Sequence, residues 1–246
     1  MIDPLDATRR LDAFVAASVS SDGGAVVAAP AAWVNAVLAP GRWLPACERA
    51  RIMRHLHAED RAARLAAWGL ARRMIGHLTG RPAATLEMVR DANGRPRVAG
   101  AAMLDFNLSH GAGWVAVGLT GGARIGVDVD GARAVGVWDE LAPAVLAEDA
   151  RARWRALEPE VRARAALALW CVKEAVLKAT GEGLAGDPRT VPAPAPGTCG
   201  GLMRGGRDYM AGSAALGVAH CLGFAVAAPV PPRLLVWSDA RPADRA

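Results

Sequence analysis

The chain has 246 residues, of which 52% are hydrophobic, enough to build a packed core in one large domain or two small ones. A formal net charge of +5 and a pI near 9.6 favour an anionic partner, which could be a nucleic acid, a phosphorylated cofactor or an acidic protein surface. One tyrosine and three phenylalanines offer few stacking platforms for nucleic acid, and the arginines are scattered along the chain. A basic nucleic-acid binder is therefore the weakest of these alternatives.

Cysteine usage and the apolar segments indicate the compartment. The four cysteines form no C-x-x-C pair and no zinc-finger pattern with the five histidines, so we expect a reduced cytoplasmic protein without zinc. The N-terminus lacks the basic start and apolar run of a secretory signal. The uncharged stretch 24–41 approaches membrane-spanning length, but it is alanine-rich and contains Pro30 and Asn35. We expect buried strand and loop there, and no membrane partner.

The first half of the chain predicts helix followed by strands. Leucine, methionine and tryptophan recur at helical spacing from Cys47 to Leu78. Asn93-Gly94, between two short apolar runs, predicts a hairpin over residues 88–98. Three strands on short turns are then expected, from Phe106 to His110, from Trp114 to Leu119 and from Arg124 to Asp130.

The second half repeats this order. A charged helical stretch is expected over residues 139–160 and a stronger helix over 161–180, which Gly181 ends. The Pro- and Gly-rich segment 192–206 is expected to be a loop, followed by late strands over 221–228 and 234–237. Because helix precedes hydrophobic strands in both halves, we expect an α+β fold of two similar subdomains with a cleft where they meet.

The chain contains only two lysines, Lys173 and Lys178, and both lie on the helix expected over 161–180. Lysine is a compact point charge on a flexible stem, suited to approaching a phosphate, whereas arginine is a rigid fork. Glu174 lies one turn before Lys178, so the two share a helix face. A solvated ion pair on the helix surface is the plain alternative to a functional site.

Asp128 and Asp130 are two residues apart in a predicted strand, so both project to the same side. Paired carboxylates of this kind suit magnesium, which prefers hard oxygen ligands and tolerates phosphate as a further ligand. Glu174 could complete a three-carboxylate site. The alternative is two solvent-facing aspartates at a strand end.

Ser109-His110 begins a glycine-rich turn, where a hydroxyl, an imidazole and backbone donors could contact one phosphate. The pair is not a hydrolase dyad, because adjacent strand residues point to opposite faces and no G-x-S-x-G elbow surrounds the serine.

Four motifs together resemble the 4′-phosphopantetheinyl transferases of the surfactin type, and they occur in that family's order and spacing. They are Asn93-Gly94-Arg95-Pro96, Phe106-Asn107-Leu108-Ser109-His110, Gly126-Val127-Asp128-Val129-Asp130, and the helix segment from Trp170 to Lys178. The upstream segment from Glu59 to Gly69 also looks like the family's N-terminal helix. The resemblance implies that the two α/β subdomains, residues 1–122 and 123–246, are related by pseudo-twofold symmetry, with the active site at their interface.

The resemblance also implies an activity, that of a magnesium-dependent, holo-[acyl-carrier-protein] synthase type enzyme. Such an enzyme transfers the phosphopantetheine arm of coenzyme A to a serine of an apo carrier protein and releases adenosine 3′,5′-bisphosphate. The implied magnesium ligands are Asp128, Asp130 and Glu174, and the implied catalytic residues are Glu174 and Lys178. The implied coenzyme A contacts are Arg51, Arg64, Asn93, Gly94, Arg95, Pro96, Ser109, His110 and Lys178.

Two departures from the family pattern bear on this reading. The family usually has glutamate where this chain has the shorter Asp130, and lysine where it has Arg95. We therefore keep a noncatalytic coenzyme A or carrier-binding protein as the alternative to a monomeric cytoplasmic transferase. The carrier is expected to dock near residues 131–160. The sequence contains no motif that indicates whether this carrier belongs to fatty acid, polyketide or nonribosomal peptide synthesis. The last two classes would place the protein in secondary metabolism.

Overall fold

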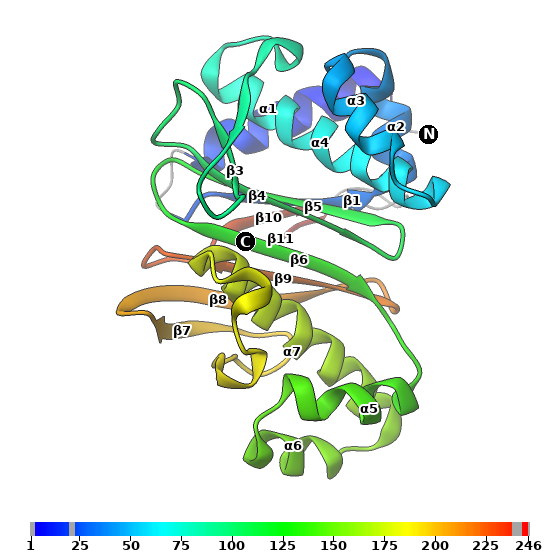
Figure 1. Ribbon diagram of the computed structural model, residues 1–246, viewed down its shortest axis with the longest axis vertical. Helices are drawn as coiled ribbons and strands as arrows, with labels where there is room; N and C mark the ends of the chain where they lie inside the picture. The colour runs from blue at the N-terminus through cyan, green and yellow to red at the C-terminus, as the bar shows by residue number, and fades with distance from the viewer. Residues whose placement is uncertain (1–2, 20–22, 238–242, 246) are drawn as a thin grey trace.

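The computed structural model describes residues 3–19, 23–237 and 243–245 of the chain. Two β-sheets pack against each other in the middle of the molecule, and the helices lie outside them, α1 to α4 on one side and α5 to α7 on the other (Figure 1). The expected mixed α+β fold is confirmed, and each half places one long helix of 22 residues against its sheet.

The first half contains four helices and five strands among its described residues. The helices are α1 (Pro4–Val19), α2 (Ala31–Leu38), α3 (Ala46–Met53) and α4 (Ala58–Thr79). The strands are β1 (Ala25–Pro30), β2 (Met88–Arg90), β3 (Pro96–Val98), β4 (Asp105–Gly111) and β5 (Trp114–Thr120). The expected helical region is thus present as two helices, and the hairpin at Asn93-Gly94 is confirmed as the β2–β3 pair.

The described residues of the second half form three helices and six strands. The helices are α5 (Val135–Val145), α6 (Glu148–Arg155) and α7 (Pro159–Thr180). The strands are β6 (Ile125–Gly131), β7 (Cys199–Arg204), β8 (Arg207–Leu216), β9 (His220–Val226), β10 (Arg233–Val236) and β11 (Ala243–Arg245).

The sheets combine strands from both ends of the chain. One has the order β11-β10-β1-β5-β4 and the other β6-β9-β8-β7. Strand β10 runs parallel to β1, so the C-terminal segment completes the sheet of the first half. The division at residue 122 remains a prediction, and any such division has to accommodate this crossing.

Two expectations about local structure were wrong. Within 24–41 the chain forms β1 and then the helix α2, because Pro30 ends the strand and is followed directly by alanine-rich sequence with high helix propensity. The predicted loop 192–206 contains the edge strand β7, none of whose residues is fully buried, so hydrophobic alternation gave no signal. A turn at Gly205-Gly206, with φ of 57° and 73°, joins it to β8.

The core has one layer between the sheets and one outside each sheet. Ile125, Val127 and Val129 of β6 pack with Val26 of β1 and Phe224 of β9 between the sheets. Helices α1, α2 and α4 cover the outer face of the first sheet, and α7 covers β6, β8 and β9 of the second. Among the described residues, no helix combines the length and hydropathy needed to cross a bilayer.

Candidate functional site

Strand β6 turns one row of side chains away from the core between the sheets. Val127 and Val129 enter that core, so Asp128 and Asp130 project to the other side, as the strand alternation predicts. Helix α7 lies over this side. Asp128 is buried there.

Two glycines allow α7 to lie close against the sheet. A Cβ at Gly126 would stand 2.0 Å from the carbonyl oxygen of Ala175, and one at Gly223 would stand 2.2 Å from the carbonyl group of Cys171. No side chain fits in either space. The absence of both Cβ atoms therefore brings the helix face that carries Glu174 within reach of β6.

A lysine, an aspartate and a serine from three elements meet at this contact. Lys178 of α7 donates from Nζ to Asp128 Oδ1 of β6 at 2.6 Å and to Ser109 Oγ of β4 at 3.1 Å. Ser109 Oγ in turn donates to Asp128 Oδ1 at 2.8 Å. The carbonyl oxygen of Val127 accepts a further bond from Nζ at 3.1 Å. The structure thus brings together three side chains that the motifs single out.

Glu174 is partly buried beside this cluster. Among the described residues its carboxylate has no hydrogen-bond or ion-pair partner, whereas Asp128 has two side-chain donors. Burial raises the pKa of Glu174 above its ordinary value, the negative charge of Asp128 raises it further, and the Lys178 ammonium opposes both. Because Asp128 and Glu174 repel each other, a cation that bound both carboxylates would be favoured.

Asp130 lies outside this cluster of hydrogen bonds and pairs with an arginine instead. Its Oδ2 forms an ion pair with Arg133 Nη2 at 2.6 Å, and its Oδ1 accepts the backbone N–H of Gly131 at 2.8 Å. Within the described part of the chain, no group of three or more acidic, histidine or cysteine side chains is arranged to hold a metal ion. The donor chemistry of Asp128 and Glu174 fits magnesium, and Asp130 would have to exchange Arg133 to join them.

His110 lies at the end of β4, next to helix α4. His110 and Asp60 both line a cavity of about 700 Å³. His110 Nδ1 lies 3.7 Å from Asp60 Oδ1. Asp60 also holds Arg64 at 2.9 Å, and this hydrogen bond lowers the pKa of the Asp60 carboxyl. Burial lowers the pKa of His110, and the charge of Arg64 adds to the effect.

The predicted anchoring arginines differ in position. Arg64 belongs to this group around His110, whereas Arg51 lies exposed in the last turn of α3. In the described structure the Arg51 side chain makes no hydrogen bond or ion pair with the site residues.

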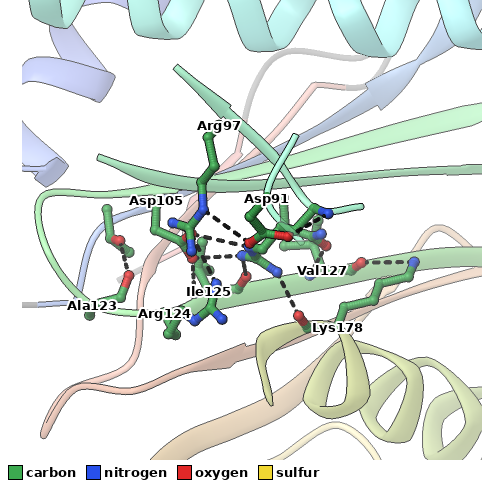
Figure 2. A network of polar contacts seen from close by, with 11 residues as sticks. Asp91, Arg97, Asp105, Ala123, Arg124, Ile125, Val127 and Lys178 are labelled. Atoms are coloured by element: carbon green, nitrogen blue, oxygen red, sulfur yellow. Dashed lines mark hydrogen bonds and ion pairs between the residues drawn. The ribbon is translucent and has the colours of Figure 1, made fainter. Parts of the chain in front are cut away.

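The β2–β3 hairpin is tied to β4 and α7 by an arginine network (Figure 2). Arg95 is buried and bonds to both carboxylate oxygens of Asp105, at 3.1 and 2.6 Å. It also donates to the carbonyl oxygens of Ile125 and Lys178, both at 2.5 Å. Burial lowers the pKa of Arg95, although Asp105 opposes the shift. Most of its donors are therefore used within the protein.

Next to this network is a small cavity of about 160 Å³. Asn93, Gly94, Arg95 and Pro96 line it with Lys178 and several residues that sequence reasoning did not single out. Those residues include Asp91, Arg124 and Gly181.

Sequence reasoning also missed how the two sheets are joined at the site. Asp105, Asn107 and Ser109 alternate along β4 and accept the backbone N–H groups of Ile125, Val127 and Val129, at 2.8, 2.9 and 3.4 Å. This polar alternation in a buried strand was a usable signal, because an amphipathic strand with one polar row predicts bonds along that row.

The fold and site define an α+β protein in which acidic and cationic side chains gather where two sheets meet. Comparison with known proteins places this architecture in a family. Residues 31–120 match the model described as "4'-phosphopantetheinyl transferase, N-terminal", and residues 124–199 match that of the "4'-phosphopantetheinyl transferase superfamily". Both matched segments are thus similar to the 4′-phosphopantetheinyl transferase superfamily.

A curated relative agrees with this assignment. The protein named 4'-phosphopantetheinyl transferase AcpT, from Salmonella typhimurium, is 32% identical over 95 residues, which cover 39% of this chain and 50% of the relative. The matched region thus spans about half the length of that relative.

Proposed function

We propose that this protein is a surfactin-type 4′-phosphopantetheinyl transferase that modifies a serine of an apo carrier protein with the phosphopantetheine arm of coenzyme A. The meeting of Lys178, Asp128 and Ser109 beside the unpartnered Glu174 carries this proposal. These groups come from β4, β6 and α7, so the site exists only in the folded chain.

In the proposed reaction the serine oxygen of the carrier bonds to the β-phosphorus of coenzyme A. The bond from that phosphorus to the oxygen of the departing adenosine 3′,5′-bisphosphate breaks. Charge develops on the phosphate oxygens during this exchange. Lys178 would turn part of its hydrogen bonding from Asp128 to these oxygens and neutralise them.

Glu174 is the proposed base for the serine proton. Burial and Asp128 raise its pKa, so its carboxylate binds a proton more readily than an exposed glutamate does. Asp128 and Glu174 would also hold magnesium, with Asp130 as a third ligand once it releases Arg133. When bound, magnesium supplies positive charge that stabilises the phosphate oxygens.

The remaining predicted contacts concern the nucleotide end of coenzyme A. Ser109 and His110 would contact its phosphates, and Arg64 would add positive charge beside His110. Asn93, Gly94 and Pro96 would line the nucleotide from the hairpin, with Arg95 holding that hairpin in place. Arg51 would contribute only by moving toward the ligand.

The protein is further proposed to act as a cytoplasmic monomer, of the holo-[acyl-carrier-protein] synthase type, that docks an acidic carrier helix near residues 131–160. The superfamily assignment and the basic net charge support an acidic carrier as partner. Carriers of nonribosomal peptide, polyketide and fatty acid synthesis are all candidates.

One observation favours a second candidate, a noncatalytic protein that binds coenzyme A or a carrier. Asp130 is neutralised by Arg133, and the described residues offer no ready group of three acidic ligands. Such a protein would bind coenzyme A without forming product.

The deciding experiment incubates the protein with coenzyme A, MgCl2 and a panel of apo carriers, and measures each carrier by intact mass spectrometry. We expect one carrier class to gain a single phosphopantetheine, and we expect the gain to disappear in Glu174→Gln or with a chelator. Binding of coenzyme A without a mass gain on any carrier would favour the noncatalytic candidate.

A further inference from the structure

Arg124 precedes β6 and lines the cavity of about 160 Å³ next to the β2–β3 hairpin. Lys178, Asn93 and Asn107 line the same cavity. Figure 2 shows Arg124 at the lower edge of the arginine network, next to Asp105 and Ile125. None of the family motifs contains this residue.

The Arg124 guanidinium is the one member of this network without a hydrogen bond among the described residues. Its Nη1 is buried without a partner, and the nearest acid oxygen, Asp105 Oδ1, is 3.8 Å away. Arg95 and Arg97, by contrast, bond to Asp105 at 2.6 Å each. A buried charged donor without a hydrogen bond costs free energy, which a long ion pair offsets only in part, so its presence requires an explanation.

Asp105 has no capacity left for Arg124. Its two oxygens already accept two bonds from Arg95, one from Arg97 and one from the backbone N–H of Ile125. A carboxylate offers about four acceptor positions, and all four are used. Arg95, Arg97 and Arg124 face only Asp91 and Asp105 here, which leaves one positive charge in excess.

Two unused donors converge on one point of the cavity wall. A Cβ added at Gly181 would stand 3.6 Å from Arg124 Nη2 and 4.0 Å from Asn93 Nδ2. Gly181 has a φ of 86°, and Gly94, which also lines the cavity, has a φ of 77°, so neither position accepts a side chain easily. The space between these donors therefore stays open to a ligand.

We propose that Arg124 binds a phosphate group of the nucleotide end of coenzyme A in this cavity, which Lys178 also lines. This proposal rests on the proposed function and adds a substrate-binding residue to it. The planar guanidinium suits a phosphate because it donates two parallel hydrogen bonds, and the anion would satisfy both the excess charge and the buried donor.

The test is calorimetric titration of coenzyme A, dephospho-coenzyme A and adenosine 3′,5′-bisphosphate into wild type and three variants. The variants are Arg124→Ala, Arg124→Lys and Arg10→Ala, the last removing an equal charge from an exposed site on α1. We expect Arg124→Ala to weaken coenzyme A binding about tenfold or more, the loss typical of one charged hydrogen-bonded pair. Arg124→Lys should recover part of it, and Arg10→Ala should match wild type.

The analogues identify the phosphate. A loss confined to ligands with the 3′-phosphate assigns Arg124 to that group, and an equal loss with dephospho-coenzyme A assigns it to the pyrophosphate. The thermal midpoint of ligand-free Arg124→Ala should fall little, because the Arg124 guanidinium makes no hydrogen bond among the described residues and its ion pair with Asp105 is long, at 3.8 Å. A clear fall would indicate a structural role and overturn the proposal.

Unchanged affinity in Arg124→Ala, or an equal loss in Arg10→Ala, would also overturn the proposal and leave the proposed function standing. If wild type bound no coenzyme A, the proposed function would fail instead. Titration with inorganic pyrophosphate would then decide whether Arg124 forms an anion site. Pyrophosphate binding that is lost in Arg124→Ala would show such a site, and binding that is retained would exclude it.

Discussion

The two lysines of α7 have different tasks although only four residues separate them. Five positions along a helix turn a side chain by about 140°, so the two point to different sides. Lys178 joins Asp128 and Ser109, whereas Lys173 is buried and donates to the carbonyl oxygens of Pro188 and Val191, each at 2.7 Å. Lys173 thus holds the segment after α7 against the helix.

Lys173 gives a prediction about pH. Burial lowers its pKa to about 8 from 10.5, so the folded state binds this proton less tightly than the unfolded chain. The charged form therefore costs stability, and this cost is relieved as pH rises from about 8 to 10.5. Relative to Lys173→Met, wild type should gain up to about 3 kcal/mol in free energy of unfolding between pH 7 and 10. Urea denaturation across this range measures it, and a flat difference would contradict it.

Glu174 gives a second prediction about pH, because its pKa is raised where that of Lys173 is lowered. Its raised pKa means that the folded state holds the proton more tightly, so ionisation costs stability as pH rises through the folded pKa. Glu174→Gln should therefore be more stable than wild type at pH 7.5, and the gain should vanish near pH 4. The midpoint of thermal unfolding at the two pH values measures the gain.

The same variant tests whether Glu174 helps to hold magnesium. MgCl2 should raise the Tm of wild type and leave that of Glu174→Gln nearly unchanged, because a bound ion stabilises the state that binds it. Asp12→Asn on α1 is a control acid away from the site, where it pairs with Arg73. A lower Tm for Glu174→Gln at pH 7.5 would mean that the carboxylate already has a stabilising partner.

At the level of elements, the position of α7 depends on two glycines of the sheet. Gly126→Ala would place a methyl group 2.0 Å from the Ala175 carbonyl oxygen and push the helix away from β6. We expect a loss of about 1–3 kcal/mol in stability and a larger loss of activity, because Glu174 and Lys178 move with the helix. Chemical denaturation and the carrier mass assay measure the two effects.

Gly136→Ala is the matched control. Gly136 lies in α5 with no atom within 4 Å of an added Cβ, so alanine should be neutral or stabilise the helix by up to about 1 kcal/mol. Equal losses in both variants would show that close contact at Gly126 is not the cause.

The elements that sequence predicts well are those with a strong local pattern. The long helix with Lys178, the Asn-Gly hairpin and the strand with Asp128 all have clear periodicity or turn chemistry. Edge strand β7 was missed because no residue in it is fully buried. The position of α2 was missed because the alanines after Pro30 favour a helix directly after the strand, without an intervening loop.

The candidate site, too, could be predicted from sequence only in part. Motif residues could be placed on elements from sequence, and three of them meet in the structure, Ser109, Asp128 and Lys178. Which charges neutralise one another could not be predicted, because the pairs join residues distant in sequence or depend on rotamers. Arg95 with Asp105 and Asp130 with Arg133 are of this kind.

At the level of the whole molecule, the first half depends on the end of the chain. Strand β10 pairs with β1, and Trp237, which follows it, is buried and stacks on Trp33 of α2 with ring centroids 4.6 Å apart. The backbone N–H of Trp237 also bonds to the carbonyl oxygen of Ala28. A fragment that ended at residue 122 would leave this edge of β1 and the face of Trp33 uncovered.

Trp237→Ala should therefore destabilise the first half more than the second, although Trp237 lies near the C-terminus. Removing a buried tryptophan costs about 3–5 kcal/mol, and here the lost contacts belong to α2 and β1. Hydrogen exchange should show faster exchange in β1 and β5 and little change in β8 and β9. Trp154→Ala, which removes a tryptophan buried against α5 and α7, should reverse this pattern. If Trp237→Ala instead loosened β8 and β9 alone, the C-terminal segment would belong energetically to the second half, as the predicted boundary at residue 122 implies.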